Sequence, residues 1–304
     1  MKIKYSASRF YLRPTISMYE REIQSRQSLN RYLTFFVALL FMILKGGNVM
    51  AGGLVDTSVE RFRASDFTDS ANITNPWWTL PAGDNFLYFA QDGEDCVWNL
   101  TEVLKATTSN FAGDYSGTNA RIVLDRSWVD EGCVYGKRGD VRDFQAFITS
   151  KPKPEPEEST YDWYAQDSEK NIWYMGEDTF DGVDNAGSFV AGCKGAKAGI
   201  VLLANPSKGD FYQQEFYEDN AEDWGKVVNF TKNNGRVCMI TKEWTPLEAG
   251  DVEHKWYCSD GITGELSLIE ELHSKTLIVQ LVGRNIKKAP PATGLPVSPI
   301  PNCS

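Results

Sequence analysis

Short runs of β-branched and aromatic residues, each bounded by turn-forming residues, recur through most of this 304-residue chain. Runs of about four to eight such residues, flanked by Gly, Pro, Asn, Asp or Ser, are typical of β-strands. Helical periodicity is weak, with one short stretch at 268–273 and a turn near 220–224. We therefore predict a mainly β fold, an antiparallel barrel, half-barrel or sandwich with few short helices. The predicted strands are 85–91, 120–128, 143–149, 161–166, 172–176, 211–217, 226–230, 236–244, 252–257 and 276–282.

An uncharged apolar run of 12 residues, 33–44, lies near the N-terminus. Three arginines precede it, and Val49 and Ala51 follow at the −3 and −1 positions of a cleavage site. This is the pattern of a secretory signal peptide, and the run is shorter than the about 20 residues that a spanning helix needs. We predict a signal peptide over residues 1–51, with Met18 as an alternative start, and a periplasmic or extracellular (secreted) protein. An uncleaved membrane anchor is the alternative.

Composition divides the rest of the chain into three parts. Residues 52–74 are a polar lead-in, and residues 75–283 carry every predicted strand as a single β domain. Residues 284–304 are a Pro-rich tail, which is expected to be extended because proline cannot donate a ladder hydrogen bond. A second Pro-rich segment, 151–156, is expected to be a surface loop.

The chain is strongly acidic, with a net charge of −10. Residues 1–51 contain eight Lys or Arg and two Glu, so the remainder holds 23 of the 31 basic and 39 of the 41 acidic residues. The mature chain then has a net charge of −16. We also predict that it has no stable membrane span. Such a surface repels phosphate backbones, so we predict no nucleic-acid partner. A small polar ligand, a cation or a glycan suits it better.

Six cysteines, an even number in an exported chain, favour disulfides over free thiols. No two of them are spaced as CxxC, so a zinc site is not predicted. Cys303 lies in the Pro-rich tail, and a disulfide there would tie the tail back onto the domain.

Two hairpins can be placed in register from their turns. In the first, pairing Gln166 with Asn171 sets Tyr164 opposite Trp173. Because side chains alternate along a strand, one face would then carry Asp162, Tyr164, Gln166, Trp173 and Glu177.

The second hairpin turns at residues 246–250. A register centred on this turn pairs Cys238 with Cys258 and Glu243 with Glu253. The cysteine pair suits a cross-strand disulfide. The two facing glutamates would repel each other unless a cation or a shared proton lies between them.

No strong catalytic signature is present: the chain has no GxSxG, HExxH, P-loop or GxGxxG motif. It has two histidines, which excludes a multi-histidine metal site. His254 lies on a predicted strand, where a single histidine is more often a structural hydrogen-bonding residue than a base. Whether the protein is an enzyme is left open.

Aromatic residues interleave with carboxylates in YDWYAQD, WYMGED, FYQQEFYEDNAED, TKEWTPLE and VEHKWY. Aromatic faces stack on sugar rings, paired carboxylates hydrolyse glycosides, and carboxylate oxygens bind calcium, the one candidate cofactor. The same residues also build an ordinary β core with an acidic surface. The predicted ligand-binding residues are Asp162, Tyr164, Trp173, Glu177, Glu215, Glu243, Trp244, Glu253 and His254.

Four of these motifs resemble an uncharacterised family of exported bacterial β-rich proteins: DWYAQD at 162–167, WYMGEDT at 173–179, KEWTPLE at 242–248 and VEHKWY at 252–257. The resemblance extends over about residues 75–282. It implies export and a β fold, and it carries over no activity.

Three functions fit these observations. The first is an exported acidic binding protein for a cation, a glycan or a small polar ligand. The second is a carbohydrate-active enzyme that uses two of the carboxylates as acid and base. The third is a lipid-carrying half-barrel, which would need an apolar lining.

Overall fold

The computed structural model describes residues 4–6, 11–13, 61–180, 187–233, 235–272, 276–287 and 300–303. The predicted signal peptide therefore lies outside the described residues except for β1 (Lys4–Ser6) and β2 (Tyr11–Arg13), which pair as a two-stranded antiparallel sheet. Within the described ranges, no helix combines the length and the apolar character needed to cross a membrane.

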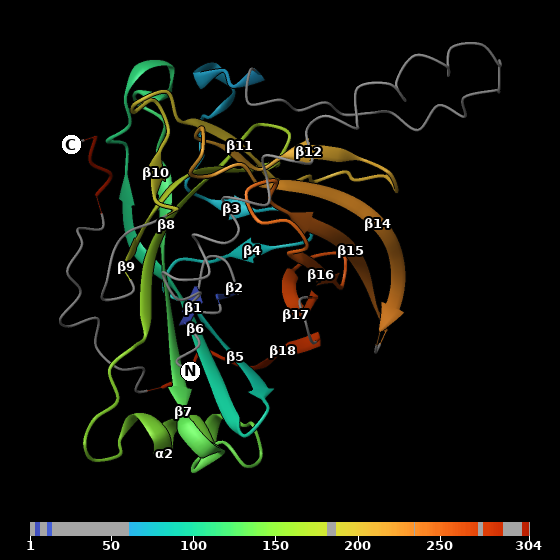
Figure 1. The fold of residues 1–304 in the computed structure, drawn as a ribbon. Helices are drawn as coiled ribbons and strands as arrows, with labels where there is room; N and C mark the ends of the chain where they lie inside the picture. The colour runs from blue at the N-terminus through green and yellow to red at the C-terminus, as the bar shows by residue number, and fades with distance from the viewer. Residues whose placement is uncertain are drawn as a thin grey trace, which may run out of the picture.

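One large antiparallel sheet makes up most of the fold, which confirms the predicted mainly β class (Figure 1). In order of hydrogen-bonded neighbours its strands are β12 (Phe211–Gln213), β14 (Trp224–Asn233), β15 (Arg236–Trp244), β16 (Val252–Ser259), β17 (Gly264–Leu272), β18 (Thr276–Arg284), β5 (Asn85–Asp92), β6 (Asp95–Thr108), β7 (Ala120–Asp130), β8 (Glu158–Gln166), β9 (Ile172–Phe180), β11 (Lys197–Leu202) and β13 (Glu215–Phe216), with β10 (Phe189–Val190) paired to β9. Short 3-10 helices lie at η2 (Ala64–Asp66), η3 (Gly113–Tyr115) and η4 (Glu131–Cys133).

The two ends of this sheet meet in one short segment, residues 211–216. β12 pairs with β14, β13 pairs with β11, and Gln214 alone separates β12 from β13. The segment therefore joins the first strand of the sheet to the last, and the sheet curls into a barrel. A Cβ atom on Gly199 of β11 would lie 2.4 Å from the carbonyl oxygen of Gln213, so a glycine is needed for this close approach.

The α-helix α2 (Val141–Ile148), at the base of Figure 1, covers the outer face of β5, β6 and β7. Asp140 caps the helix, because its side chain accepts hydrogen bonds from the backbone N–H groups of Arg142 and Asp143. The helix packs against the outward-facing side chains of Leu87, Trp98, Leu100 and Trp128.

The predicted strand at 143–149 is wrong, because this segment forms α2. Its apolar side chains Phe144, Phe147 and Ile148 are spaced by three and four residues, which places them on one face of a helix. Strand β6 was not predicted, because α2 covers its outer face and the barrel interior covers its inner face. With both faces buried, polar and apolar residues do not alternate along the strand.

β11 and β17 were also not predicted as strands, and the predicted helical stretch at 268–273 is wrong as far as Leu272. Residues 268–272 pair with both β16 and β18. The pairing of β16 with β17 is irregular between Trp256, which is opposite Leu268, and Tyr257, which is opposite Leu266. This irregularity interrupts the alternation of apolar and polar residues along β17, so the apolar residues recur at a spacing typical of a helix.

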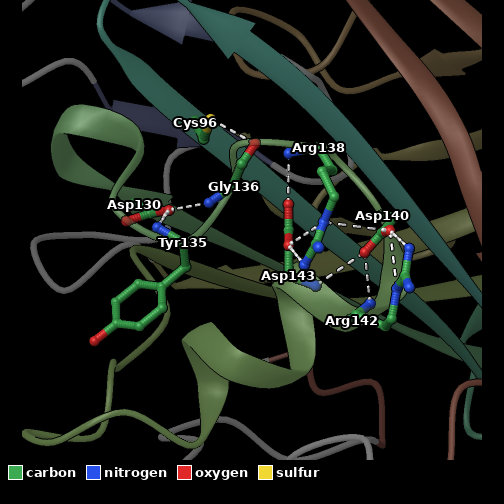
Figure 2. A network of polar contacts seen from close by, with 8 residues as sticks. All are labelled: Cys96, Asp130, Tyr135, Gly136, Arg138, Asp140, Arg142 and Asp143. Carbon is green, nitrogen blue, oxygen red and sulfur yellow. Dashed lines mark hydrogen bonds and ion pairs between the residues drawn. The ribbon is translucent and has the colours of Figure 1, made fainter.

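The loop that joins β7 to α2 is held by a network of polar contacts (Figure 2). Asp130 accepts hydrogen bonds from the backbone N–H groups of three successive residues, 134–136, at 2.8 to 3.1 Å. Arg138 donates to Asp143 from both its backbone N–H and its guanidinium. The disulfide Cys96–Cys133 fastens the same loop to β6.

Residues 67–80, here called the plug segment, cross one end of the barrel and carry β3 (Ile73–Thr74) and β4 (Thr79–Leu80), which lie between the green and the orange strands in Figure 1. The Trp78 ring lies 5.3 Å from the ring of Tyr164 on β8 and 6.1 Å from that of Tyr257 on β16, as measured between centroids. β8 and β16 are on opposite walls of the barrel. The packed structure therefore begins before residue 75, with Phe67 and Ile73 buried.

Three disulfides join the six cysteines: Cys96–Cys133, Cys193–Cys303 and Cys238–Cys258. The disulfide Cys238–Cys258 is the predicted cross-strand pair of the second hairpin. The disulfide Cys193–Cys303 connects the tail to the domain, as expected.

Candidate functional site: carboxyl groups in the barrel interior

Strands β7, β8 and β9 present a group of buried carboxyl side chains, here called the Asp162 cluster: Asp125, Asp162 and Glu177. Asp162 is directly opposite Glu177 in the strand register. The Tyr174 hydroxyl donates a hydrogen bond to Asp162 Oδ1 at 2.5 Å and lies 3.0 Å from Glu177 Oε2. One phenol therefore links two carboxyl groups that are removed from water.

Burial raises the pKa of Asp162 well above its usual range, and the charges of Asp125 and Glu177 raise it further. Burial also raises the pKa of Asp125 to about 7, although hydrogen bonds from Thr101 and Asp162 oppose this shift. Asp162 Oδ2 contacts no N–H or hydroxyl donor among the described residues. A hydrogen bond between the Asp162 and Asp125 carboxyl groups requires that one of the two holds a proton.

Glu215, on the short strand β13, belongs to the same region of the interior. Its charge contributes to the raised pKa of Tyr174, after the larger effects of burial, Asp162, Glu177 and Tyr164. The Tyr164 ring stacks on the Tyr174 ring with centroids 5.0 Å apart. Four of the predicted residues thus lie together: Asp162, Tyr164, Glu177 and Glu215.

A second set of carboxyl groups, here called the Glu253 row, runs across β15, β16 and β17. Glu243 is opposite Glu253, and Glu253 is opposite Glu271. Lys255 Nζ lies 2.8 Å from Glu243 Oε2 and 3.1 Å from Glu253 Oε2. The predicted pairing of Glu243 with Glu253 is confirmed, and the cation between them is Lys255.

One lysine does not satisfy the whole row. Glu253 Oε1, Glu271 Oε2 and the Tyr212 hydroxyl are buried and have no hydrogen-bond partner among the described residues. The Tyr212 ring lies over Gly225, the residue opposite Glu243, since a Cβ there would be 2.6 Å from the ring. Burial and then the charge of Glu253 raise the pKa of Glu271.

Two tyrosines connect the two sets of carboxyl groups. The pKa of Tyr164 is raised by burial and by the Asp162 cluster, with a smaller effect from Tyr257. The pKa of Tyr257 is raised by burial and then by Glu243. Because the Trp78 ring lies between these tyrosines, both sets line one interior beside the plug segment.

Trp173 does not lie with the Asp162 cluster, because the predicted register of the first hairpin is wrong by one residue. Gln166 pairs with Ile172, and Ala165 pairs with Trp173. Asp167 closes a longer loop by accepting hydrogen bonds from the Asn171 backbone N–H and from Trp173 Nε1. This places the Trp173 ring against Phe62 and Phe67.

Trp244 and His254 lie on the face of the sheet opposite to the Glu253 row, because each alternates with a residue of that row. The Trp244 ring stacks on Phe211 with centroids 5.6 Å apart. His254 Nδ1 lies 3.2 Å from Glu270 Oε2. Neither residue joins the interior set.

Sequence reasoning missed five interior residues: Asp125, Tyr174, Tyr212, Lys255 and Glu271. Lys255 is two residues from Glu253, so strand alternation alone could have placed it on the same face. Glu271 was hidden by the wrong helical prediction. Within the described ranges, no three His, Cys, Asp or Glu side chains are grouped so as to hold a metal ion.

No family model and no curated protein matches this chain. A solved structure from Bacteroides fragilis, of a protein described as exported with a YmcC-like fold, is 10% identical to it. That alignment covers 68% of this chain and 97% of the other, with a TM-score of 0.32. At this score the likeness supports no statement about the fold or the function of this chain.

Proposed function

We propose that this chain is an exported binding protein that takes a small cationic ligand in the interior of its barrel. The observation that carries the proposal is the Glu253 row, where three buried carboxyl groups face one lysine and two carboxyl oxygens have no partner among the described residues. Burying an ionised carboxylate is costly unless a cation or a proton compensates it. A cationic ligand would supply the missing charge.

The location of the protein follows from chemistry that is independent of the site. Three disulfides persist in an oxidising compartment and are rare in a reducing cytoplasm. Together with the signal-peptide pattern at residues 33–51, they support export to the periplasm or the extracellular medium.

A carbohydrate-active enzyme is the second candidate function. The Asp162 cluster supports it, because Asp125, whose pKa is raised to about 7, lies beside Asp162, whose pKa burial raises well above its usual range. General acid and base catalysis needs two groups of this kind. The lipid-carrying half-barrel is less well supported, since the same carboxyl groups are poor neighbours for an acyl chain.

Thermal melting of the purified, oxidised protein tests the proposal. The panel contains organic cations, calcium and other divalent ions, and glycans. A ligand that binds only the folded state raises the melting temperature, and at about a hundred times its Kd it adds about 2.7 kcal/mol of stability. The proposal expects a saturable shift with an organic cation that Glu253→Gln reduces and the exposed control Glu94→Gln preserves. Shifts with glycans alone, accompanied by their hydrolysis, would favour the enzyme instead.

A further inference from the structure

We infer that the cationic group of the ligand is an ammonium, held between the carboxyl groups of Glu253 and Glu271. This inference rests on the proposed function and names the chemical class of the ligand's charged group.

The Glu253 row contains two gaps of the same construction. Each gap lies between two glutamates that are direct cross-strand partners: Glu243 and Glu253 in the first gap, Glu253 and Glu271 in the second. Directly opposed residues on antiparallel strands hold their Cβ atoms about 5 Å apart. One of the two pairs is hydrogen-bonded and the other is not, so the two gaps offer carboxyl groups at backbone spacings that differ by only about 1 Å.

The first gap already holds an ammonium group. Lys255 Nζ contacts one oxygen of each neighbouring carboxylate, at 2.8 and 3.1 Å. These are ordinary lengths for charge-assisted hydrogen bonds. The chain itself thus demonstrates which group fits between two glutamates of this row.

The second gap contains carboxyl oxygens that can accept hydrogen bonds, but no donor from the described residues reaches them. Glu253 directs one oxygen to Lys255 and leaves the other, Oε1, without a partner among the described residues. Glu271, which is only 1% exposed, likewise leaves Oε2 without a partner. Unsatisfied buried oxygens are rare in folded proteins, and here two of them belong to facing carboxyl groups.

An ammonium suits this gap better than the other common organic cations. It is a compact donor of up to three hydrogen bonds, whereas a guanidinium is a wide planar fork and a quaternary ammonium donates none. Solvent reaches the row at Lys255, whose side chain keeps 14% exposure. A primary amine could enter beside it with its carbon chain directed outward.

Melting and calorimetric titration with methylammonium chloride test the inference. Tetramethylammonium chloride at equal concentration is the matched control, because it has the same charge and no N–H donor. We expect a saturable rise in melting temperature with methylammonium and none with tetramethylammonium. Glu271→Gln should raise the Kd by about tenfold or more, the loss of one charge-assisted contact, while the exposed control Glu94→Gln should leave it unchanged.

A second variant keeps the test informative should Glu271→Gln fold poorly. Lys255→Ala empties the first gap, so methylammonium should restore part of the melting temperature that this substitution removes, and tetramethylammonium should not. Equal effects of the two cations, or no effect of methylammonium on either the wild type or Lys255→Ala, would overturn the inference. If calcium or another cation still raises the melting temperature in that case, the proposed binding function survives, and if no cation does, both fail.

Discussion

Asp162 and Glu177 face each other across β8 and β9, and the hydroxyl of Tyr174 contacts both carboxyl groups. Two ionised carboxylates would repel strongly in such a buried position. The cluster is therefore most stable when it holds at least one proton, and this makes the stability of the barrel sensitive to pH.

Stability should fall as the pH rises from about 4 to 7. The Asp125 carboxyl titrates at its ordinary 3.8 in the unfolded chain and at about 7 in the folded protein. Between these values the unfolded state binds fewer protons, so unfolding becomes easier by up to about 1.4 kcal/mol per pH unit for one group. Urea unfolding at a series of pH values measures this slope.

The isosteric variant Asp125→Asn should flatten that slope, because an amide does not titrate. Asp260 serves as the contrast: hydrogen bonds from the backbone N–H groups of Thr263 and Ile262 lower its pKa. Asp260→Asn should leave the slope between pH 4 and 7 unchanged. A wild-type stability that rises with pH across this window would contradict the assignment.

Replacing Tyr174 by phenylalanine should destabilise the protein by about 1 to 3 kcal/mol. The change removes the hydroxyl that donates to Asp162 and leaves two buried carboxyl groups without it. Tyr135→Phe is the matched control, since Tyr135 is 36% exposed. Chemical denaturation of both variants gives the comparison, and equal losses would show that the Tyr174 contacts contribute nothing.

Trp78→Ala should cost about 3 to 5 kcal/mol, the range for removing a buried large aromatic side chain. Its ring connects β8 to β16 through Tyr164 and Tyr257, so a cavity would open between opposite walls. Trp256→Ala should cost less, because Trp256 is half-buried and contacts His254 edge-on. Thermal or urea unfolding distinguishes the two, and similar losses would mean that the plug segment does not brace the barrel.

Asp130→Ala should loosen the loop between β7 and α2. Its carboxylate accepts hydrogen bonds from three consecutive backbone N–H groups, which would then lose their partner. Limited trypsin digestion should cut faster after Lys137 and Arg138, both exposed in this loop. The exposed control Asp114→Ala should be cut at the wild-type rate, and unchanged cleavage in Asp130→Ala would contradict the role given to this side chain.

Local features of the sequence were enough to place the hairpin of β15 and β16. A register centred on its turn predicted the Cys238–Cys258 disulfide and the facing pair Glu243 and Glu253, and both are present. The same reasoning failed by one residue in the hairpin of β8 and β9. There the side chain of Asp167 closes a longer loop, a choice that turn length alone does not reveal.

The mainly β class, the Cys238–Cys258 pairing and the acidity of individual strands were therefore determined by the sequence itself, because composition, alternation and turn spacing are properties of neighbouring residues. Tertiary structure alone decided that residues 211–216 join β11 to β14 and that the plug segment lies between opposite walls. It also decided that Asp125 meets Asp162 and that Glu271 is beside Glu253. The first two of these features depend on how the sheet closes, which is settled by packing between residues far apart in the chain. The two carboxyl pairs depend on the register between successive strands, β7 with β8 and β16 with β17, which turn spacing did not reveal.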